Sequence, residues 1–320
     1  MNQNLFSALC DFRNIQRAYQ DAKKSKRFKR DILEFGFSVE DNLSNLRENF
    51  LTGTYRHGGY RSFIVVDSKK RNIEVAPFRD RVVHHAVVNV IEPIFEKSFI
   101  YDSYACRKGK GTHAAVSRTK KFMAGVSENF AKRAYFLQFD VKKYFESIDH
   151  GILLRLIRKK IKDAAIFGVI EEIVRSKLGD KGIPIGNLTS QLFANIYLNE
   201  LDHFIKEKLG VRYYLRYMDD FLIFHEDPKK LVVFKREIDG FVSSELLLKL
   251  GKKRSGIELA DRVDFLGYVL FPHYVKLRKS TVSRAVHHFR KEGTISSLSE
   301  VWNGYAKFAD AHTLIEKLSS

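Results

Sequence analysis

Two apolar and aromatic runs in the second half of the chain surround a pair of neighbouring carboxylates. The runs span residues 213–216 and 221–224, and they flank Asp219-Asp220. Their aromatic and branched side chains predict two β-strands, so the acidic pair is expected at or near the tip of a hairpin. Aspartate is also a common turn residue, and the hairpin alone therefore favours an ordinary polar turn over a functional site.

The same periodicities predict a chain of mixed helices and strands. Helices are expected over 5–50, 79–95, 152–161, 188–209 and 230–250, with short helices after residue 271. Strands are expected over 63–66, 71–75, 134–139 and 263–271, the first two being joined by a turn at 67–70. Ser147 or Asp149 can cap the helix that begins near residue 152. The chain has five prolines and shows neither a repeat nor a low-complexity tract, so no flexible linker marks a domain boundary.

The net charge of the chain indicates which class of partner it binds. Fifty-six Lys and Arg residues against 38 Asp and Glu residues give a formal charge of +18. A chain this basic usually binds a polyanion, and nucleic acid is the commonest polyanion. A basic surface without such a partner, or attraction to an anionic membrane, would also account for the charge. Residues 23–30 hold six cations, which are interpreted either as a solvated helix face or as contacts to a phosphate backbone.

Other classes of protein are disfavoured by what the sequence lacks. No apolar run approaches the roughly 20 residues that span a bilayer, and the N-terminus has no secretory signal pattern. Two cysteines cannot form a disulfide framework or a four-thiolate zinc site. The adjacent pairs His84-His85 and His287-His288 lack the i, i+4 spacing of a helical metal site. These features predict a cytoplasmic protein without membrane partners.

A third carboxylate gives the acidic pair a possible chemistry. Asp140 ends the predicted strand at 134–139, and the hairpin with Asp219 and Asp220 follows later in the chain. If these strands lie side by side in one sheet, three carboxylates converge and require a counter-charge. Magnesium prefers oxygen ligands, and two such ions activate an attacking hydroxyl and stabilise a leaving pyrophosphate. The sequence thus predicts a site with two Mg²⁺ ions for nucleotide polymerisation.

Five segments of the chain, in order, resemble the motifs of reverse transcriptases. Residues 139–150 resemble motif A, 182–199 motif B, 217–220 motif C, 246–255 motif D and 265–268 motif E. The similarity runs from about residue 63 to about residue 277. It implies an α+β, right-hand polymerase fold with an antiparallel palm sheet. The implied regions are the N-terminal region and fingers at 1–133, palm at 134–150, a fingers insertion at 151–180, palm at 181–274 and a short helical thumb at 275–320.

The resemblance also implies a role for individual residues. The metal ligands would be Asp140, Asp219 and Asp220, assisted by the carbonyl of Val141. Contacts to the incoming deoxynucleotide would come from Lys69, Arg71, Lys143, Tyr144, Phe145, Ile185 and Gly186. Phe145 would be the steric gate that excludes a ribose 2′-hydroxyl, unless it is a core aromatic. Lys69 and Arg71 would grip the triphosphate, unless they form an ordinary basic turn. Lys253 would protonate the pyrophosphate, with Lys252 and Arg254 competing for that position.

Motif B is similar to that of one subgroup, the reverse transcriptases of diversity-generating retroelements. Most reverse transcriptases carry Gln and Pro where this chain carries Ile185 and Gln191, and residues 77–85 also resemble the subgroup. Members copy a template RNA into cDNA, misread adenines and return the mutated copy to a protein-coding gene. They work with a small basic protein, the accessory variability determinant, in bacteria, archaea or phages. Ile185 cannot make the hydrogen bond of a Gln, and this loss is worth only about 2- to 12-fold in rate.

Two alternatives remain open at this point. The chain can be another bacterial reverse transcriptase, such as a retron, group II intron-like or defence-associated enzyme. It can also be a non-catalytic RNA-binding protein that keeps the fold, although the presence of Asp140, Asp219 and Asp220 speaks against that interpretation. Under either polymerase interpretation the partners are an RNA template, its cDNA product and deoxynucleoside triphosphates.

Overall fold

The chain forms two compact units, each built from several stretches of sequence. The computed structural model describes residues 4–66, 70–251, 256–292 and 308–309. The first unit comprises 1–101, 141–203 and 240–250, and the second comprises 102–140, 204–239 and 251–320. Three lysines and an arginine with predicted roles lie outside the described residues: Lys69, Lys252, Lys253 and Arg254.

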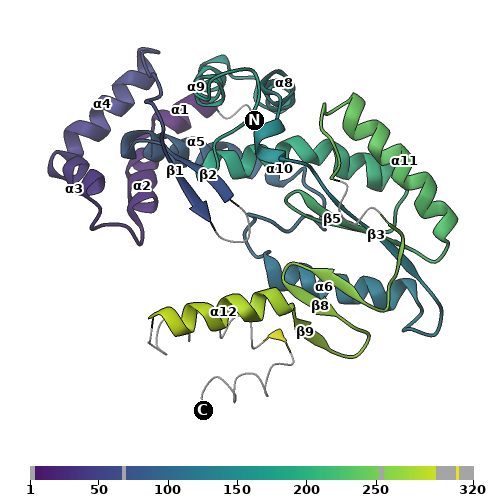
Figure 1. Cartoon of the computed structure of the whole chain (residues 1–320). Helices are drawn as coiled ribbons and strands as arrows, with labels where there is room; N and C mark the ends of the chain where they lie inside the picture. The colour runs from purple at the N-terminus through teal and green to yellow at the C-terminus, as the bar shows by residue number, and fades with distance from the viewer. Residues whose placement is uncertain (1–3, 67–69, 252–255, 293–307, 310–320) are drawn as a thin grey trace. The chain divides into compact units, whose positions relative to one another are not determined.

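Helices make up most of the first unit. They are α1 (Leu5–Cys10), α2 (Phe12–Lys23), α3 (Arg30–Phe37), α4 (Val39–Leu51), α5 (Phe78–Glu96), α7 (Tyr144–Ser147), α8 (His150–Lys160), α9 (Ala164–Arg175) and α10 (Leu188–His203). Helix α5 is central, since α1, α2, α3, α9 and α10 all contact it (Figure 1). Its apolar residues face several directions and are buried, which explains why the helix has no single polar face.

A two-stranded hairpin completes the first unit. Strands β1 (Arg61–Val66) and β2 (Lys70–Val75) pair in an antiparallel register that sets Val65 opposite Arg71. The predicted hairpin is therefore confirmed. Every residue of β1 is exposed, so this ribbon buries little apolar surface of its own along that strand.

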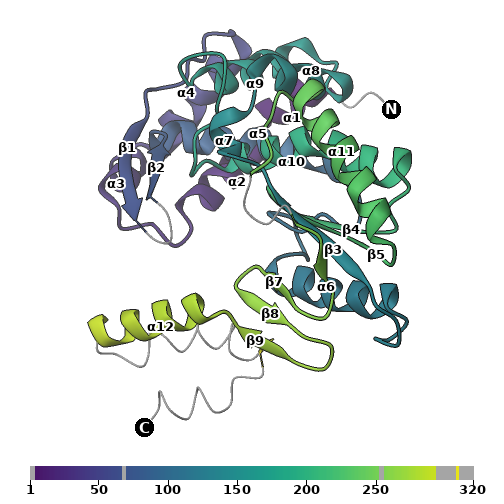
Figure 2. The same cartoon turned by 45° about the vertical axis from the view of Figure 1, so that its right-hand side comes forward.

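The second unit is built on a four-stranded sheet. Its strand order is β4 (Tyr213–Tyr217), β5 (Asp220–His225), β3 (Tyr135–Asp140) and β6 (Glu258–Leu259). Helix α6 (Thr112–Val126) contacts β4 and β5, as Figures 1 and 2 show. The shared core contains Val116, Met123, Phe136, Leu222 and Phe224, so the alternating apolar residues of these strands turn toward the helix.

The single strand predicted over 263–271 is wrong, because the chain folds back on itself there. Strands β7 (Val263–Phe265) and β8 (Tyr268–Leu270) form a hairpin that β9 (Val275–Leu277) extends into a three-stranded sheet. The two-residue turn holds Leu266 at φ 51° and Gly267 at φ 89°. Two successive positive φ values match the twist of a tight hairpin, and the glycine makes such a turn accessible. A strand thus precedes helix α12 (Lys279–Glu292), where only helices were expected.

Three helix ends differ in detail from their prediction. Asp149, not Ser147, caps α8 by accepting a hydrogen bond from the Ile152 amide at 3.1 Å. Helix α10 continues as a π-helical turn over Phe204–Lys208. Helix α11 (Pro228–Ser244) ends before residue 250, where Leu247 adopts a positive φ of 50°. The chain after α11 is then free to pair with the strand-like segment that follows Asp140.

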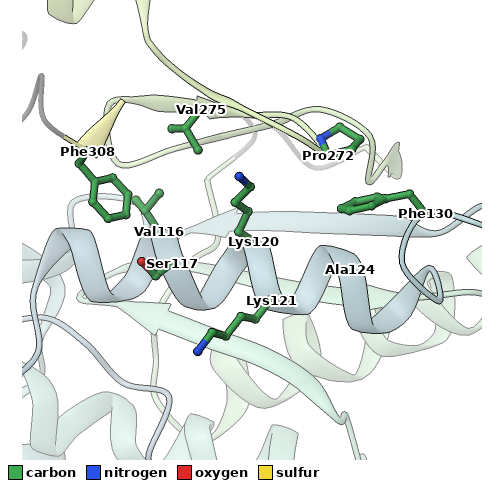
Figure 3. Close-up of a pocket in the computed structure, with 9 residues that line it drawn as sticks. All are labelled: Val116, Ser117, Lys120, Lys121, Ala124, Phe130, Pro272, Val275 and Phe308. Atoms are coloured by element: carbon green, nitrogen blue, oxygen red, sulfur yellow. The ribbon is translucent and has the colours of Figure 1, made fainter. Parts of the chain in front are cut away.

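A cavity of about 440 Å³ lies beside α6 in the second unit (Figure 3). It is lined by Val116, Ser117, Lys120, Lys121, Ala124, Phe130, Pro272, Val275 and Phe308. Lys120 reaches toward the β9 side of the cavity, whereas Lys121 points away from it (Figure 3). No carboxylate is part of this lining, so the cavity is separate from the acidic hairpin. Among the helices that the structure describes, none has the length and apolar character needed to cross a membrane.

Candidate active site

The register of the four-stranded sheet brings two of the predicted carboxylates together. Strands β3 and β5 are antiparallel neighbours, and Asp140 is paired directly with Asp220. Residues directly opposite in such a pair point to the same face, with Cβ atoms roughly 4.5–5.5 Å apart. Both side chains are half-buried at the end of their strands. The prediction that these distant segments lie side by side is confirmed.

The third carboxylate lies in the turn between β4 and β5. Tyr217 pairs with Asp220, which leaves Met218 and Asp219 as the two residues of the loop. Met218 has a φ of 56°, a left-handed conformation that a long side chain rarely adopts. The guanidinium of Arg216 donates a hydrogen bond to the Met218 carbonyl at 3.0 Å. This bond stabilises the turn that contains Asp219, the residue that directly precedes Asp220 in the chain.

Arg216 is a residue that sequence reasoning missed. It is fully buried, although it lies in a strand of otherwise apolar and aromatic residues. Its amide donates to the Asp102 carbonyl at 2.9 Å, and its own carbonyl accepts from the Tyr104 amide at 2.9 Å. These backbone bonds fix the strand, while the bond from the guanidinium to the Met218 carbonyl offsets part of the cost of burying the charge. The signal in the sequence was this one cation three residues before Asp219.

Gly251 is a second missed residue, and it lies directly against Asp140. Its amide donates to the Asp140 carbonyl at 2.7 Å. A Cβ atom added to Gly251 would come within 2.5 Å of Asp140 Oδ1, closer than real side-chain atoms approach. The Asp140 carboxylate can therefore occupy its position only if residue 251 is a glycine. The weak motif D resemblance covered this position without identifying it.

The donor set of this sheet end fits magnesium by its chemistry. Its oxygen ligands are carboxylates, which hard divalent cations prefer. Two carboxylates placed opposite each other repel unless a cation lies between them. In the described parts of the chain, however, no three His, Cys, Asp or Glu side chains are grouped closely enough to hold a metal ion. The convergence of all three carboxylates on two Mg²⁺ ions thus stays a prediction.

The segment after Asp140 belongs to the first unit and carries several predicted nucleotide contacts. Val141 is buried and bridges Leu250, while the Lys142 amide donates to the Lys249 carbonyl at 2.8 Å. Lys143 has a φ of 49° and forms an ion pair with Glu146 at 3.2 Å. This left-handed residue ends the extended segment and begins α7.

Tyr144 needs a correction, whereas the steric-gate role of Phe145 stays a prediction. The Tyr144 side chain is only 3% exposed, and its hydroxyl donates to the Ala194 carbonyl at 2.5 Å. It is therefore part of the interior, and a nucleotide contact by its ring is not expected. Phe145 is half-buried and meets the Tyr144 ring edge-on at 5.7 Å. Its carbonyl accepts from the Ile183 amide at 2.8 Å, which joins the end of motif A to the loop of motif B.

The loop that contains Ile185 and Gly186 packs on the β1–β2 hairpin. The Ile185 carbonyl accepts a hydrogen bond from the Glu74 amide at 3.1 Å. Gly186 has a φ of 120°, and a Cβ there would lie 3.2 Å from Ile73 Cγ2. Arg71 is exposed on the same strand as Ile73. Contacts inside the first unit therefore connect Phe145, the Ile185 loop and the strand that carries Arg71.

Gln191 is placed on α10, within its first turn. Its side chain is exposed, although the neighbouring residues Ser190 and Leu192 are buried. An exposed side chain among buried neighbours is available to a ligand or to solvent. The predicted role of Gln191 in fidelity stays a prediction.

The run at 77–85 is structural in its placement. Asp80 is fully buried and accepts hydrogen bonds from the Tyr55 hydroxyl and the Gly58 amide, both at 3.0 Å. His84 is also buried, with its Nε2 atom 3.1 Å from that of His57. Burial, together with the neighbouring His57 and His85, lowers the pKa of His84 to about 3. Asp80 and His84 thus fasten the preceding loop to α5 from the interior.

Comparison with known proteins gives this geometry a context. The family model for "Reverse transcriptase (RNA-dependent DNA polymerase)" matches residues 56–270. Protein YkfC of Escherichia coli (strain K12) is 26% identical over 75% of this chain and 73% of its own length. The group II intron-encoded protein LtrA of Lactococcus lactis subsp. cremoris is 28% identical over 68% of this chain and 38% of its own length.

Similar solved structures include telomerases. Telomerase from Candida albicans, in complex with a fragment of telomeric RNA, superposes with a TM-score of 0.54 at 11% identity, covering 77% of this chain and 54% of that chain. Telomerase from Candida tropicalis gives 0.55 at 13% identity, with coverages of 77% and 54%. At such low identity the likeness concerns the fold alone, and it confirms the expected α+β, right-hand polymerase fold. The chain spans about half the length of these telomerases and little more than a third of LtrA.

Proposed function

This chain belongs to the reverse transcriptase family of RNA-dependent DNA polymerases, and on that premise we propose that it copies an RNA template into cDNA at the sheet end that carries Asp140 and Asp220. The observation that carries this proposal is the direct pairing of these two carboxylates across β3 and β5. Asp219 follows in the adjoining turn. An ordinary polar turn has no reason to pair its acid with a carboxylate from a distant strand, because like charges opposite each other are destabilising.

The protein would supply ligands and orientation for the reaction. Asp140, Asp219 and Asp220, with the carbonyl of Val141, would hold two Mg²⁺ ions. Bound there, the ions would lower the pKa of the primer hydroxyl and neutralise the phosphates of the nucleotide. Gly251 leaves room for the Asp140 carboxylate, and Arg216 holds the turn that carries Asp219. These two residues act through the ligands and are positioning residues.

Selection of the nucleotide would fall to the first unit. Phe145 would exclude a 2′-hydroxyl, Arg71 and Lys69 would bind the triphosphate, and Lys253 would donate a proton to pyrophosphate. Lys143, Ile185 and Gly186 would complete the nucleotide site. The contacts that join Phe145 to Ile183, and Ile185 to Glu74, support a common site. We keep the assignment of 1–133 and 151–180 to fingers, 134–150 and 181–274 to palm, and 275–320 to thumb as part of this proposal.

Primer extension on an RNA template tests the polymerase. Asp219→Ala should abolish extension, because it removes a metal ligand. Asp261→Asn is the matched control, since this exposed acid in the second unit has no ion pair within the described chain and should not alter extension. If Asp219→Ala still extends primers, the acidic hairpin is not the active site. If neither the wild type nor the control extends primers while both bind RNA, the chain is an RNA-binding protein with this fold.

We further propose the diversity-generating subtype, with low fidelity at template adenines and a small basic accessory protein as partner. Ile185 and Gln191 in motif B support it, because most reverse transcriptases carry Gln and Pro at these two positions. Ile185→Gln should restore a hydrogen-bonding group and lower misincorporation opposite adenine by about 2- to 12-fold. Deep sequencing of cDNA from both forms measures this change, and errors opposite template uridine serve as the internal control.

A group II intron-like reverse transcriptase is the second candidate. The similarity to LtrA favours it, because that relative is an intron-encoded protein. The two candidates differ in their error spectrum. An adenine-specific excess of errors in the wild-type cDNA supports the diversity-generating subtype. A low and even error rate at all four template bases, unchanged by Ile185→Gln, supports the intron-like enzyme.

A further inference from the structure

The turn between α2 and α3 presents cations around an exposed aromatic ring. This segment, residues 24–30, is called the basic turn, and its cations are Lys24, Lys26, Arg27, Lys29 and Arg30, all exposed. Phe28 lies near the middle of the basic turn, and it is 81% exposed. An aromatic ring that is exposed to solvent among charged side chains lacks the burial that usually stabilises such a ring. The arrangement therefore points to a partner that supplies both a flat apolar face and negative charge.

The structure changes the interpretation of this cationic run. A solvated helix face was one alternative, but only Lys23 ends α2 and Arg30 begins α3, with the residues between them outside any helix. Arg30 forms an ion pair with Glu34 at 2.7 Å. For Lys24, Lys26 and Lys29, the described chain contains no acidic group within ion-pairing distance. Most of the positive charge in the basic turn is thus not neutralised by the described residues.

The basic turn is also ordered by its own backbone. The Lys26 amide donates to the Lys23 carbonyl, and the Lys29 amide donates to the Lys26 carbonyl, both at 3.0 Å. The guanidinium of Arg27 lies over the Phe28 ring, 5.0 Å from its centroid. On either side, α2 and α3 contact α5 (Figure 1). A turn fixed in this way loses little conformational freedom when it binds a ligand.

We propose that the basic turn binds single-stranded RNA, with Phe28 stacked on an unpaired base and the lysines on flanking phosphates. Stacking on an aromatic side chain together with backbone neutralisation is how proteins bind single strands without reading their sequence. Duplexes keep their bases stacked on each other and offer no free face to Phe28. The inference rests on the proposed function, because the strand would be part of the RNA template away from the nucleotide site.

Equilibrium binding of the full chain to a labelled, unstructured 20-nucleotide RNA tests this inference, without primer or nucleotides. Phe28→Ala should weaken binding by roughly 5- to 100-fold, and Phe28→Trp should restore it, since every base can stack on an indole. Phe37→Ala is the matched control. Phe37 is 86% exposed at the other end of α3, followed closely by the acidic Glu40 and Asp41, and its loss should leave the affinity unchanged.

The charge contribution has its own readout. Lys26→Ala and Lys29→Ala should each weaken binding for all sequences and reduce the slope of log affinity against log salt by about 0.7, the value for one phosphate of a single strand. Phe28→Ala should leave this slope unchanged. An effect of Phe28→Ala no larger than that of Phe37→Ala overturns the inference, as does equal sensitivity with a fully paired RNA duplex. Tighter binding of single-stranded DNA than of RNA of the same sequence, through the same Phe28, would overturn the choice of RNA as the partner.

The same assay in the Asp219→Ala background separates this inference from the polymerase proposal. If that variant no longer extends primers yet still binds RNA through Phe28, both proposals stand. If the wild type extends primers but binding does not depend on Phe28, only the inference about the basic turn fails. If the wild type does not extend primers but its binding does depend on Phe28, only the polymerase proposal fails.

Discussion

At the scale of single residues, a glycine beside the carboxylates matters as much as the carboxylates themselves. Gly251 lies so close to Asp140 that any Cβ would overlap the carboxylate. A displaced Asp140 would no longer be aligned with Asp220 across the sheet. Misplacement of a reacting group by about 1 Å can cost roughly 100-fold in rate. The glycine is therefore expected to control activity more than stability.

Gly251→Ala should lower primer extension by roughly 100-fold while the protein remains folded. Single-turnover extension measures the rate, and circular dichroism monitors the fold. Gly240→Ala is the control, since this glycine of α11 has no atoms within 4 Å of its added Cβ and a helical alanine stabilises by about 0.5–1 kcal/mol. Full activity of Gly251→Ala would show that Asp140 can adjust without loss.

The sequence predicted the carboxylates but not the residues that position them. Asp140 and Asp219 follow recognisable strands, so their neighbourhood could be inferred from periodicity. Gly251 and Arg216 act through contacts with Asp140 and with the 102–104 segment, and no local pattern encodes contacts between such distant parts of the chain. The hairpin at 266–267 was missed for another reason. Apolar residues flank Gly267 directly on both sides, so only the glycine marked the turn.

At the scale of elements, the hairpin of β4 and β5 depends on a buried cation. Arg216 donates to the Met218 carbonyl and pairs through its backbone with the segment at 102–104. A buried polar group left without its partner costs about 1–3 kcal/mol. The turn that carries Asp219 is thus coupled to the interior of the second unit through one residue, whose side chain bonds the turn and whose backbone bonds the 102–104 segment.

Arg216→Met should lower the free energy of unfolding by about 1–3 kcal/mol and reduce primer extension, because the Met218 carbonyl loses its donor. Urea unfolding and extension assays report the two effects separately. Arg236→Met, on the exposed surface of α11, should change stability by no more than about 0.5 kcal/mol. Wild-type stability and activity in Arg216→Met would show that the guanidinium does not hold the turn.

The interior of α5 gives the protein a dependence on pH. Burial and the neighbouring His57 and His85 lower the pKa of His84 from 6.5 to about 3, so this ring stays neutral in the folded state. The unfolded chain takes up the proton first as the pH falls below 6.5. Stability should therefore decrease between pH 6.5 and 3, by up to about 1.4 kcal/mol per pH unit for this one group.

Urea unfolding at pH 7.5 and pH 5.5 measures this decrease. His84→Gln should lose part of the pH dependence, because glutamine does not titrate, even if its stability at pH 7.5 is lower. His273→Gln is the control for the exchange of a histidine for glutamine at an exposed position. An unchanged pH dependence in His84→Gln would mean that other groups cause it.

At the scale of the whole molecule, we expect the net charge of +18 to control the affinity of the protein for any polynucleotide. Each phosphate contact releases counterions, and about six to ten contacts to a duplex lower affinity by 10³- to 10⁵-fold between 50 and 200 mM salt. Single strands carry a lower charge density and give a smaller effect. The charge is spread over both units, so the salt dependence reports on the chain as a whole.

RNA affinity should consequently fall by at least about tenfold between 50 and 200 mM salt. Fluorescence anisotropy at a series of salt concentrations measures the slope. An analogue of the same base sequence with an uncharged backbone is the control, and its binding should be weak and nearly independent of salt. An RNA affinity that barely changes over this range would contradict the electrostatic interpretation of the net charge.

The left-handed Met218 sets a limit on how this protein can be made more robust. Glycine or asparagine at 218 would suit a φ of 56° far better than methionine, and these are the residues preferred in tight hairpin turns. The exchange would also loosen the loop that presents Asp219, since glycine permits many more backbone conformations. Heat tolerance gained at this position would come with slower synthesis, so thermostable forms of the enzyme should be sought through changes far from the β4–β5 turn.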